Sequence, residues 1–243
     1  MRMVWRMTNH SGSSSGDVPE LHFQRSTYFR RYEMFHTTFY MRRLHSLVGL
    51  IVIGVFLFEH VFTNSTVLGG AKAFNDALAM MDLIPRPLFY GLEVFAIALP
   101  ILFHAIYGIY IAAQAKNNPG NYGYVRNWQF AVQRYTAWLL IPFLIWHVGY
   151  MRVWEKGIMG THINYDLLYT YFVTGDYAIL HTVLYTLGMI AAIFHFCNGI
   201  STFCMTWGIA KGPRAQSVIN ALAMSLCTLM SLVTLAFMGS YFM

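Results

Sequence analysis

Five long apolar runs, separated by shorter polar connections, divide most of the chain. They cover about residues 44–61, 88–113, 130–151, 177–207 and 218–243. A membrane-spanning helix needs about 20 predominantly apolar residues, so the pattern predicts five transmembrane helices. Between the first two runs, residues 71–83 are expected to form a short surface helix, which residues 84–87 interrupt.

The composition supports this interpretation. Hydrophobic residues make up 57% of the chain and charged residues only 11%, against roughly 25% charged in a typical soluble domain. The predicted fold class is therefore all-α, an integral membrane bundle of five helices. The three cysteines lie in apolar runs at spacings that fit neither a metal site nor a disulfide framework.

The predicted domains are an N-terminal arm, residues 1–43, and a transmembrane domain, residues 44–243. The arm is polar and aromatic, lacks the apolar core of a secretory signal peptide, and is interpreted as an interfacial segment that leads into the membrane.

Lysines and arginines set the predicted orientation, because cytoplasmic connections are enriched in them. The arm and the second and fourth connections carry 12 of the 16 basic residues. The N-terminus is thus predicted to be cytoplasmic and the C-terminus outside, with membrane lipid as the surrounding partner. Since the basic residues are spread over connections, the net charge of +6 does not indicate a nucleic-acid partner.

Four of the runs carry one histidine each deep within the apolar sequence, away from the start of the run: His60, His104, His147 and His195. An ionisable residue at this depth is a functional-site hypothesis by default. A helix rises 1.5 Å per residue, so His60 and His147 share a level near the outer surface, and His104 and His195 share a level nearer the cytoplasm. The two levels differ by very roughly 18 Å.

A pair of histidines with no carboxylate or thiolate beside it lacks ligands for zinc or copper. Haem supplies four nitrogens of its own and needs two axial ligands, so the pattern predicts two bis-histidine haems. Such an iron has no open position, which favours electron transfer. Small residues near the histidines, Gly108, Gly149, Gly188 and Gly199, are expected to let flat macrocycles approach the backbone.

Motifs from Tyr40 to about Arg214 carry a resemblance to a known family. The segments RRLHSLVGLIVIGVFLFEH, FHAIYGIYIAAQAKNN, YGYVRNWQFAVQRYT, IWHV and IFHFCNGI resemble the di-haem, five-helix cytochrome b subunit of succinate:menaquinone reductases and quinol:fumarate reductases. The resemblance implies a bacterial cytoplasmic membrane anchor for a flavoprotein subunit and an iron–sulfur subunit, which carry the dicarboxylate chemistry. A dimer of such heterotrimers is an oligomeric alternative.

The resemblance also implies two haems b and a menaquinone or menaquinol site toward the outer face. His104 and His195 resemble the ligands of the haem nearer the iron–sulfur subunit, and His60 and His147 those of the distal haem. Some relatives carry a glutamate two residues before the fourth-span ligand, where this chain has Ile193. Proton transfer through that position is therefore not expected here.

Polar residues at the cytoplasmic starts of two runs are candidates to bind haem propionates, because arginine forks suit carboxylates. The candidates are Arg42, Arg43, His45 and Ser46 before the first run, and Arg126, Gln133 and Arg134 before and within the third.

Three carboxylates lie at or near the outer side: Asp82, Glu93 and Glu59. Quinone reduction takes up two protons and quinol oxidation releases two, so a carboxylate near the ring oxygens is expected. We rank Asp82 first from the family resemblance and Glu59 last, because it neighbours a predicted ligand.

Two alternatives stay open. One is the di-haem cytochrome b anchor of another quinone-linked enzyme, such as a hydrogenase or formate dehydrogenase. The other is a non-redox transporter or structural anchor whose histidines relay protons. Cytochrome b of the bc complexes is disfavoured because it places two ligands on each of two helices, whereas here each histidine has its own helix.

Overall fold

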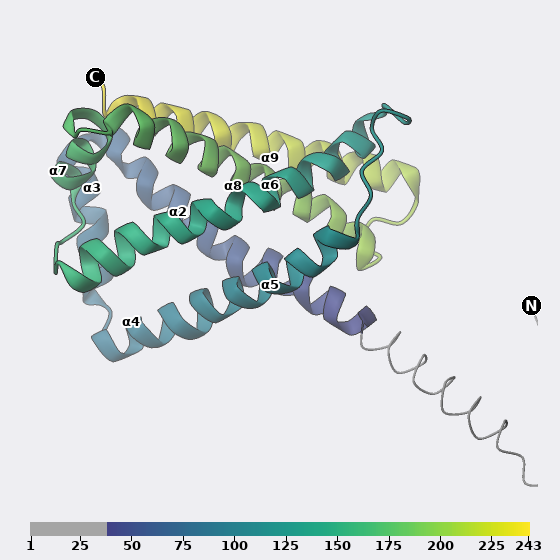
Figure 1. Cartoon of the computed structure of the whole chain (residues 1–243), viewed down its shortest axis with the longest axis horizontal. Coiled ribbons are helices and arrows are strands. Elements are labelled where there is room, and N and C mark those ends of the chain that lie inside the picture. Colours follow the sequence, from purple (N-terminus) through teal and green to yellow (C-terminus); the bar gives the residue numbers. More distant parts are fainter. Residues whose placement is uncertain (1–37) are drawn as a thin grey trace, which may run out of the picture. The chain divides into compact units, whose positions relative to one another are not determined.

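The computed structural model describes residues 38–243, which are mostly helical and contain no strand. Five helical segments are long and apolar enough to cross a membrane: Thr38–Leu83, Arg86–Gln114, Val125–Ile158, Ala178–Thr206 and Gly212–Ser240. The predicted all-α, five-span fold is confirmed (Figure 1). The interfacial role assigned to the arm concerns residues 1–37, which lie outside the described part.

The first span consists of several helical pieces. Residues 38–47 are helical and continue as the π-helix η1 (Val48–Ile53) and α2 (Gly54–Ser65). A 3₁₀ turn, η2 (Thr66–Gly69), then leads to α3 (Gly70–Ala79) and η3 (Met80–Leu83). Gly70 has a φ of 88°, a conformation that glycine adopts without steric cost, and it separates α3 from the turn. Helix α3 begins one residue before the surface helix predicted over residues 71–83 and ends four residues before its end.

The second and third spans extend beyond their apolar runs at both ends, and the fifth begins earlier than its run, because helices continue through polar and aromatic residues at the membrane interface. The fourth span agrees with its run to within one residue at each end. The elements are α4 (Arg86–Leu92), η4 (Glu93–Ala98) and α5 (Leu99–Gln114) in the second span, α6 (Val125–His147) and η5 (Val148–Ile158) in the third, α7 (Tyr165–Tyr169) and η6 (Thr170–Thr174) in the third connection, and then α8 (Ala178–Thr206) and α9 (Gly212–Ser240). The third span, predicted over 130–151, thus covers 125–158.

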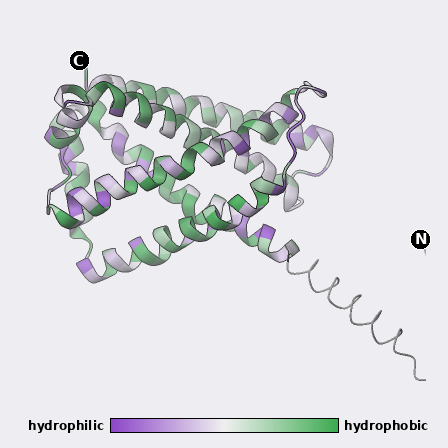
Figure 2. Ribbon diagram, viewed as in Figure 1, coloured by the Kyte–Doolittle hydropathy of each residue, from purple (hydrophilic) through white to green (hydrophobic). Residues whose placement is uncertain are grey.

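Helix α8 lies at the centre of the packing. It contacts α9, α6 and η1, and Figure 1 shows α8 and α9 running side by side. Helix α5 has no buried residue. Hydrophobic residues occur along all the long helices (Figure 2), and many large apolar side chains of the bundle are exposed. Exposed apolar side chains are expected where a helix faces lipid.

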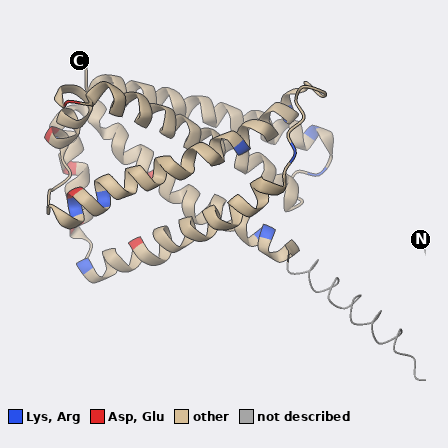
Figure 3. Ribbon diagram, viewed as in Figure 1, with Lys and Arg blue, Asp and Glu red and all other residues tan. Residues whose placement is uncertain are grey.

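The two ends of the bundle differ in charge (Figure 3). We call the end with connections 115–124 and 207–211 the basic end, because its charged residues within the described part are all lysine or arginine. The opposite end, which we call the mixed-charge end, holds α3 and α7. The described carboxylates of this half of the bundle lie there, together with Lys72, Arg86, Arg152 and Lys156. This asymmetry agrees with a cytoplasmic basic end, which stays a prediction.

Candidate functional site

The four intramembrane histidines form two pairs inside the bundle. In the first pair, His60 of α2 faces His147, the last residue of α6, with ring centroids 5.9 Å apart and ring planes at 72°. In the second pair, His104 of α5 faces His195 of α8, with centroids 6.2 Å apart and planes at 84°. These are the two pairs expected from depth, and each joins two different helices.

The spacing within each pair suits two imidazoles on opposite sides of one metal ion. A metal–imidazole bond is about 2.0–2.1 Å long and the ring centre lies about 1 Å behind the nitrogen, so two such centroids are about 6.3 Å apart. The observed 5.9 and 6.2 Å agree with this value. Within residues 38–243, no group of three or more histidine, cysteine or carboxylate side chains is placed so that it could hold a metal ion. A metal bound here would therefore have to bring further ligands of its own.

Hydrogen bonds at Nδ1 orient three of the four rings. His104 Nδ1 lies 3.1 Å from the carbonyl oxygen of His45, His195 Nδ1 lies 3.3 Å from Oγ1 of Thr136, and His147 Nδ1 lies 3.1 Å from the Tyr185 hydroxyl. Engaging Nδ1 directs Nε2 to a metal, which is the usual arrangement of ligating histidines. Sequence reasoning missed Thr136 and Tyr185, although Thr136 is one helical turn from the candidate Gln133.

These contacts also measure the distance between the two pairs. Thr136 marks the level of His195 on the third span, and His147 follows it by 11 residues, or about 16 Å. On α8, Tyr185 marks the level of His147 and precedes His195 by 10 residues, or about 15 Å. The two helices thus agree with each other and lie close to the separation of roughly 18 Å expected from sequence.

A glycine allows the backbone to approach the second pair closely. A Cβ atom placed on Gly49 would lie 2.3 Å from Cε1 of His104, far inside normal contact. Of the glycines expected near the histidines, Gly188 faces the ring of Phe143, which stacks on His147. Gly108 faces His45, whereas a Cβ at Gly149 or Gly199 would meet no atom within 4 Å. Gly49 was not among the expected residues.

At the basic end, the candidates from the first span form a network with α8. Arg43 donates to the carbonyl oxygen of Thr206 at 3.3 Å, and its guanidinium lies 5.1 Å from the ring centroid of Trp207. Trp207 Nε1 donates to Ser46 Oγ at 3.1 Å, and Ser46 donates to the Arg43 carbonyl oxygen. This network joins the start of the first span to the end of the fourth.

His45 and Arg42 occupy different environments. The His45 ring stacks on His104, with centroids 4.0 Å apart and planes within 8°, and its buried Nε2 has no hydrogen-bond partner among the described residues. Arg42 is exposed and donates to Gln114 at 3.3 Å. Of these two candidates, only His45 touches a histidine of a pair.

The three candidates from the third span also differ in their bonding partners. Gln133 Nε2 donates to the carbonyl oxygen of His195 at 3.0 Å, and its Oε1 accepts from buried Asn198 at 2.8 Å. Arg126 bonds to Gln216 of α9 at 2.9 Å, and Arg134 bonds to the carbonyl oxygen of Phe130. Gln133 therefore supports the second pair directly, whereas the two arginines bond elsewhere.

The three predicted carboxylates are not brought together. Asp82 is exposed in η3, Glu59 accepts from Thr63 Oγ1 at 2.6 Å, and Glu93 forms two parallel bonds of 2.6 Å with Arg152. This fork joins the second and third spans, and both side chains are partly exposed, at 22% for Glu93 and 37% for Arg152. Glu93 is therefore engaged in an ion pair that sequence reasoning missed.

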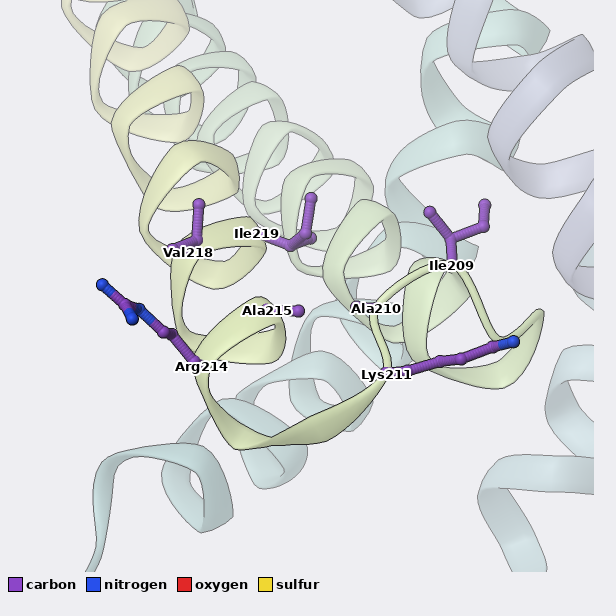
Figure 4. Close-up of a pocket in the computed structure, with 7 residues that line it drawn as sticks. All are labelled: Ile209, Ala210, Lys211, Arg214, Ala215, Val218 and Ile219. Carbon is purple, nitrogen blue, oxygen red and sulfur yellow. The ribbon is translucent and has the colours of Figure 1, made fainter.

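A pocket at the basic end lies apart from the histidines. It occupies the turn between α8 and α9, where the side chains of Lys211 and Arg214 point in different directions (Figure 4). Its lining residues are Ile209, Ala210, Lys211, Arg214, Ala215, Val218 and Ile219.

Five membrane-length helices that hold two inward-facing histidine pairs define a class of integral membrane proteins with paired intramembrane histidines. No family model matches the chain. The chain is 42% identical over 201 residues to the succinate dehydrogenase cytochrome b558 subunit of Bacillus subtilis (strain 168), a match that covers 83% of this chain and 93% of that protein. The chain belongs to this family of succinate dehydrogenase cytochrome b subunits, which confirms the resemblance read from its motifs.

Proposed function

We propose that this chain is the membrane-anchor cytochrome b subunit of a succinate dehydrogenase or fumarate reductase complex. It passes electrons through two bis-histidine haems b between a cytoplasmic iron–sulfur subunit and menaquinone or menaquinol. The proposal rests on the two inward-facing histidine pairs. Their four residues lie on four separate helices, and the ring centroids within the pairs are 5.9 and 6.2 Å apart.

The residues present fit haem better than a metal bound by protein alone. Each site offers two imidazoles, and no group of three metal-binding side chains within residues 38–243 could hold a metal ion; a porphyrin would supply four further nitrogens. The two histidines of each pair would hold a haem whose chemistry would be single-electron exchange. His60 and His147 would hold one haem, and His104 and His195 the other.

The protein's own contribution is to orient the ligands and to exclude water. The carbonyl of His45, Thr136 Oγ1 and the Tyr185 hydroxyl fix three imidazoles through Nδ1. Such hydrogen bonds set both the ring orientation and the basicity of the coordinating nitrogen. Apolar helix surface around both pairs keeps the local dielectric low, which strengthens every electrostatic interaction inside the bundle.

The charge asymmetry between the two ends supports docking of the iron–sulfur subunit at the basic end. The second pair lies nearer the basic end, where Arg43, His45 and Ser46 are placed to meet haem propionates and where the iron–sulfur subunit would dock. The first pair lies toward the mixed-charge end, near which menaquinone would react. Asp82 is the leading proton-exchange carboxylate there because it is exposed, whereas Glu93 is held by Arg152 and Glu59 by Thr63.

Spectra of single-histidine variants test the proposal. Wild-type complex is expected to contain two low-spin haems b per chain by pyridine haemochrome assay. His60→Ala and His147→Ala should remove one spectral component, and His104→Ala and His195→Ala the other. His162→Ala is the matched control, because His162 is an exposed residue of the third connection, and this variant should retain both spectral components.

Three results would contradict the proposal. Absence of haem bands would favour a proton-relay transporter or structural anchor, and a single haem would refute the count. Loss of the same spectral component in His60→Ala and His104→Ala would refute the pairing.

A further inference from the structure

The pocket between α8 and α9 combines cationic and apolar side chains, and no carboxylate lines it. Lys211 and Arg214 supply the charge, and Ile209, Val218 and Ile219 supply apolar surface (Figure 4). Its volume is about 540 Å³, within the range of roughly 300–1,000 Å³ that small-molecule sites occupy. This lining suits a ligand that is anionic at one end and apolar at the other.

The two cations of the pocket have no partner of their own. Lys211 and Arg214 are exposed, and within residues 38–243 they form neither an ion pair nor a side-chain hydrogen bond. A third cation lies nearby, because Arg126 of α6 donates to Gln216 of α9 at 2.9 Å, two residues beyond Arg214. Three basic residues therefore gather around the first turns of α9.

The backbone of the pocket is held in place by the turn itself. The amides of Ile209 and Ala210 both donate to the carbonyl oxygen of Cys204 at 2.9 Å, and Ala210 is only 4% exposed. Gly208 and Gly212 have φ angles of 71° and 83°, which glycine adopts without steric cost. A ligand would therefore have to order only the two long cationic side chains, which limits the entropic cost of binding.

An exposed apolar stripe leads from the pocket along α9. Val218, Leu222 and Leu229 follow Arg214 at intervals of four, four and seven residues, so all four lie on one face of the helix. Val218 is 53% exposed, Leu222 62% and Leu229 60%. The helix rises about 16 Å from Val218 to Leu229, close to half of a hydrocarbon core about 30 Å thick. Arg214 thus stands at the head of an apolar track one leaflet long.

Charge and shape together distinguish among the occupants that this site could take. A phosphate with no cation of its own matches the two basic side chains, whereas a zwitterionic headgroup would bring an ammonium group against them. A docked protein subunit would meet the cations but would not cover the stripe, which continues into the hydrocarbon region. Basic pockets between the ends of membrane helices are typical sites for anionic lipid headgroups.

We propose that the pocket binds the headgroup of one anionic phospholipid from the leaflet at the basic end, with its acyl chains along the exposed stripe of α9. Lys211 and Arg214 flank the phosphate, and Arg126 adds positive potential beside it. The apolar stems of the long cationic side chains stay on the helix surface while their charged ends reach the headgroup. The site lies apart from both histidine pairs and does not depend on the proposed redox function.

Native mass spectrometry of the delipidated complex in neutral detergent tests the inference. The probes are phosphatidylglycerol, which is anionic, and phosphatidylcholine, which is zwitterionic, with identical acyl chains. The wild type should bind one phosphatidylglycerol at least tenfold more tightly than phosphatidylcholine, and the double variant Lys211→Gln, Arg214→Gln should lose this preference. Lys116→Gln is the matched control, because Lys116 is exposed at the same end but does not line the pocket. This control should keep the preference.

Two further arms separate the lipid from other occupants. The charge-conserving double variant Lys211→Arg, Arg214→Lys should retain the preference for phosphatidylglycerol. Glycerol 3-phosphate at equal concentration should not displace the bound lipid, because it cannot cover the stripe of α9.

Four results would overturn the inference. They are equal affinity of the wild type for both lipids, an unchanged preference in the charge-removing double variant, loss of the preference in the Lys116→Gln control, and displacement of the lipid by glycerol 3-phosphate. Loss of the cytoplasmic subunits from the charge-removing variant, with its lipid preference unchanged, would assign the pocket to protein docking instead. The comparison of the two lipids on the wild type needs no variant, so it stands even where a variant fails to assemble.

Discussion

Replacement of Gly49 by alanine should remove the haem bound by His104 and His195. The new Cβ would lie 2.3 Å from Cε1 and 2.6 Å from Nδ1 of His104. Carbon atoms in normal contact are about 3.5–4.0 Å apart, so the ring would have to move by more than about 1 Å. Metal sites tolerate ligand displacements of about 0.2 Å. The same movement would disrupt the 3.1 Å bond between His104 Nδ1 and the His45 carbonyl.

Local helix stability cannot account for such a loss. Alanine in a helix interior is more favourable than glycine by roughly 0.5–1 kcal/mol, so Gly49→Ala should not weaken the helix itself. Gly91→Ala is the matched control, because a Cβ there meets no atom within 4 Å. Reduced-minus-oxidised spectra and haem content per chain should show one haem in Gly49→Ala and two in Gly91→Ala. Two haems with unchanged spectra in Gly49→Ala would refute this account of the close packing.

Two further predictions concern the mixed-charge end. Arg152→Lys should lower the stability of the haem-loaded subunit by about 1–3 kcal/mol, because lysine cannot form both bonds to Glu93. Thermal melts followed by circular dichroism check this, and an unchanged melting temperature would show that the fork does not clamp the two spans. Asp82→Asn should impair quinone-dependent turnover while leaving both haem spectra and succinate-to-artificial-acceptor activity intact. If Asp82→Asn, Glu93→Gln and Glu59→Gln all retain full quinone activity, the outer quinone site is misplaced.

The sequence by itself determined the architecture of this protein. Within hydrocarbon, each backbone amide and carbonyl must be bonded inside its own helix, so length and composition are sufficient to identify the spans. The helical rise also converts sequence position into depth, and depth alone matches His60 with His147, and His104 with His195. The ends of the spans were predicted less well, because helices continue through interfacial residues such as those of η5 (Val148–Ile158).

Only the tertiary structure decided which side chains support each histidine. Depth does not specify how far a helix is rotated about its axis, and rotation is set by packing against neighbouring helices. Tyr185 at His147, Thr136 at His195 and Gly49 at His104 were therefore found only in the folded bundle.

The same reason applies to the carboxylates. The fork between Glu93 and Arg152 joins residues 59 positions apart on two spans, and no local pattern distinguishes it from two separate charges. From the sequence alone, Glu155 cannot be distinguished from an ordinary solvated residue of a polar connection. Its burial, at 9% exposure, arises only when the third connection folds over the mixed-charge end of the bundle. Long-range packing, rather than local composition, gives this carboxylate its environment.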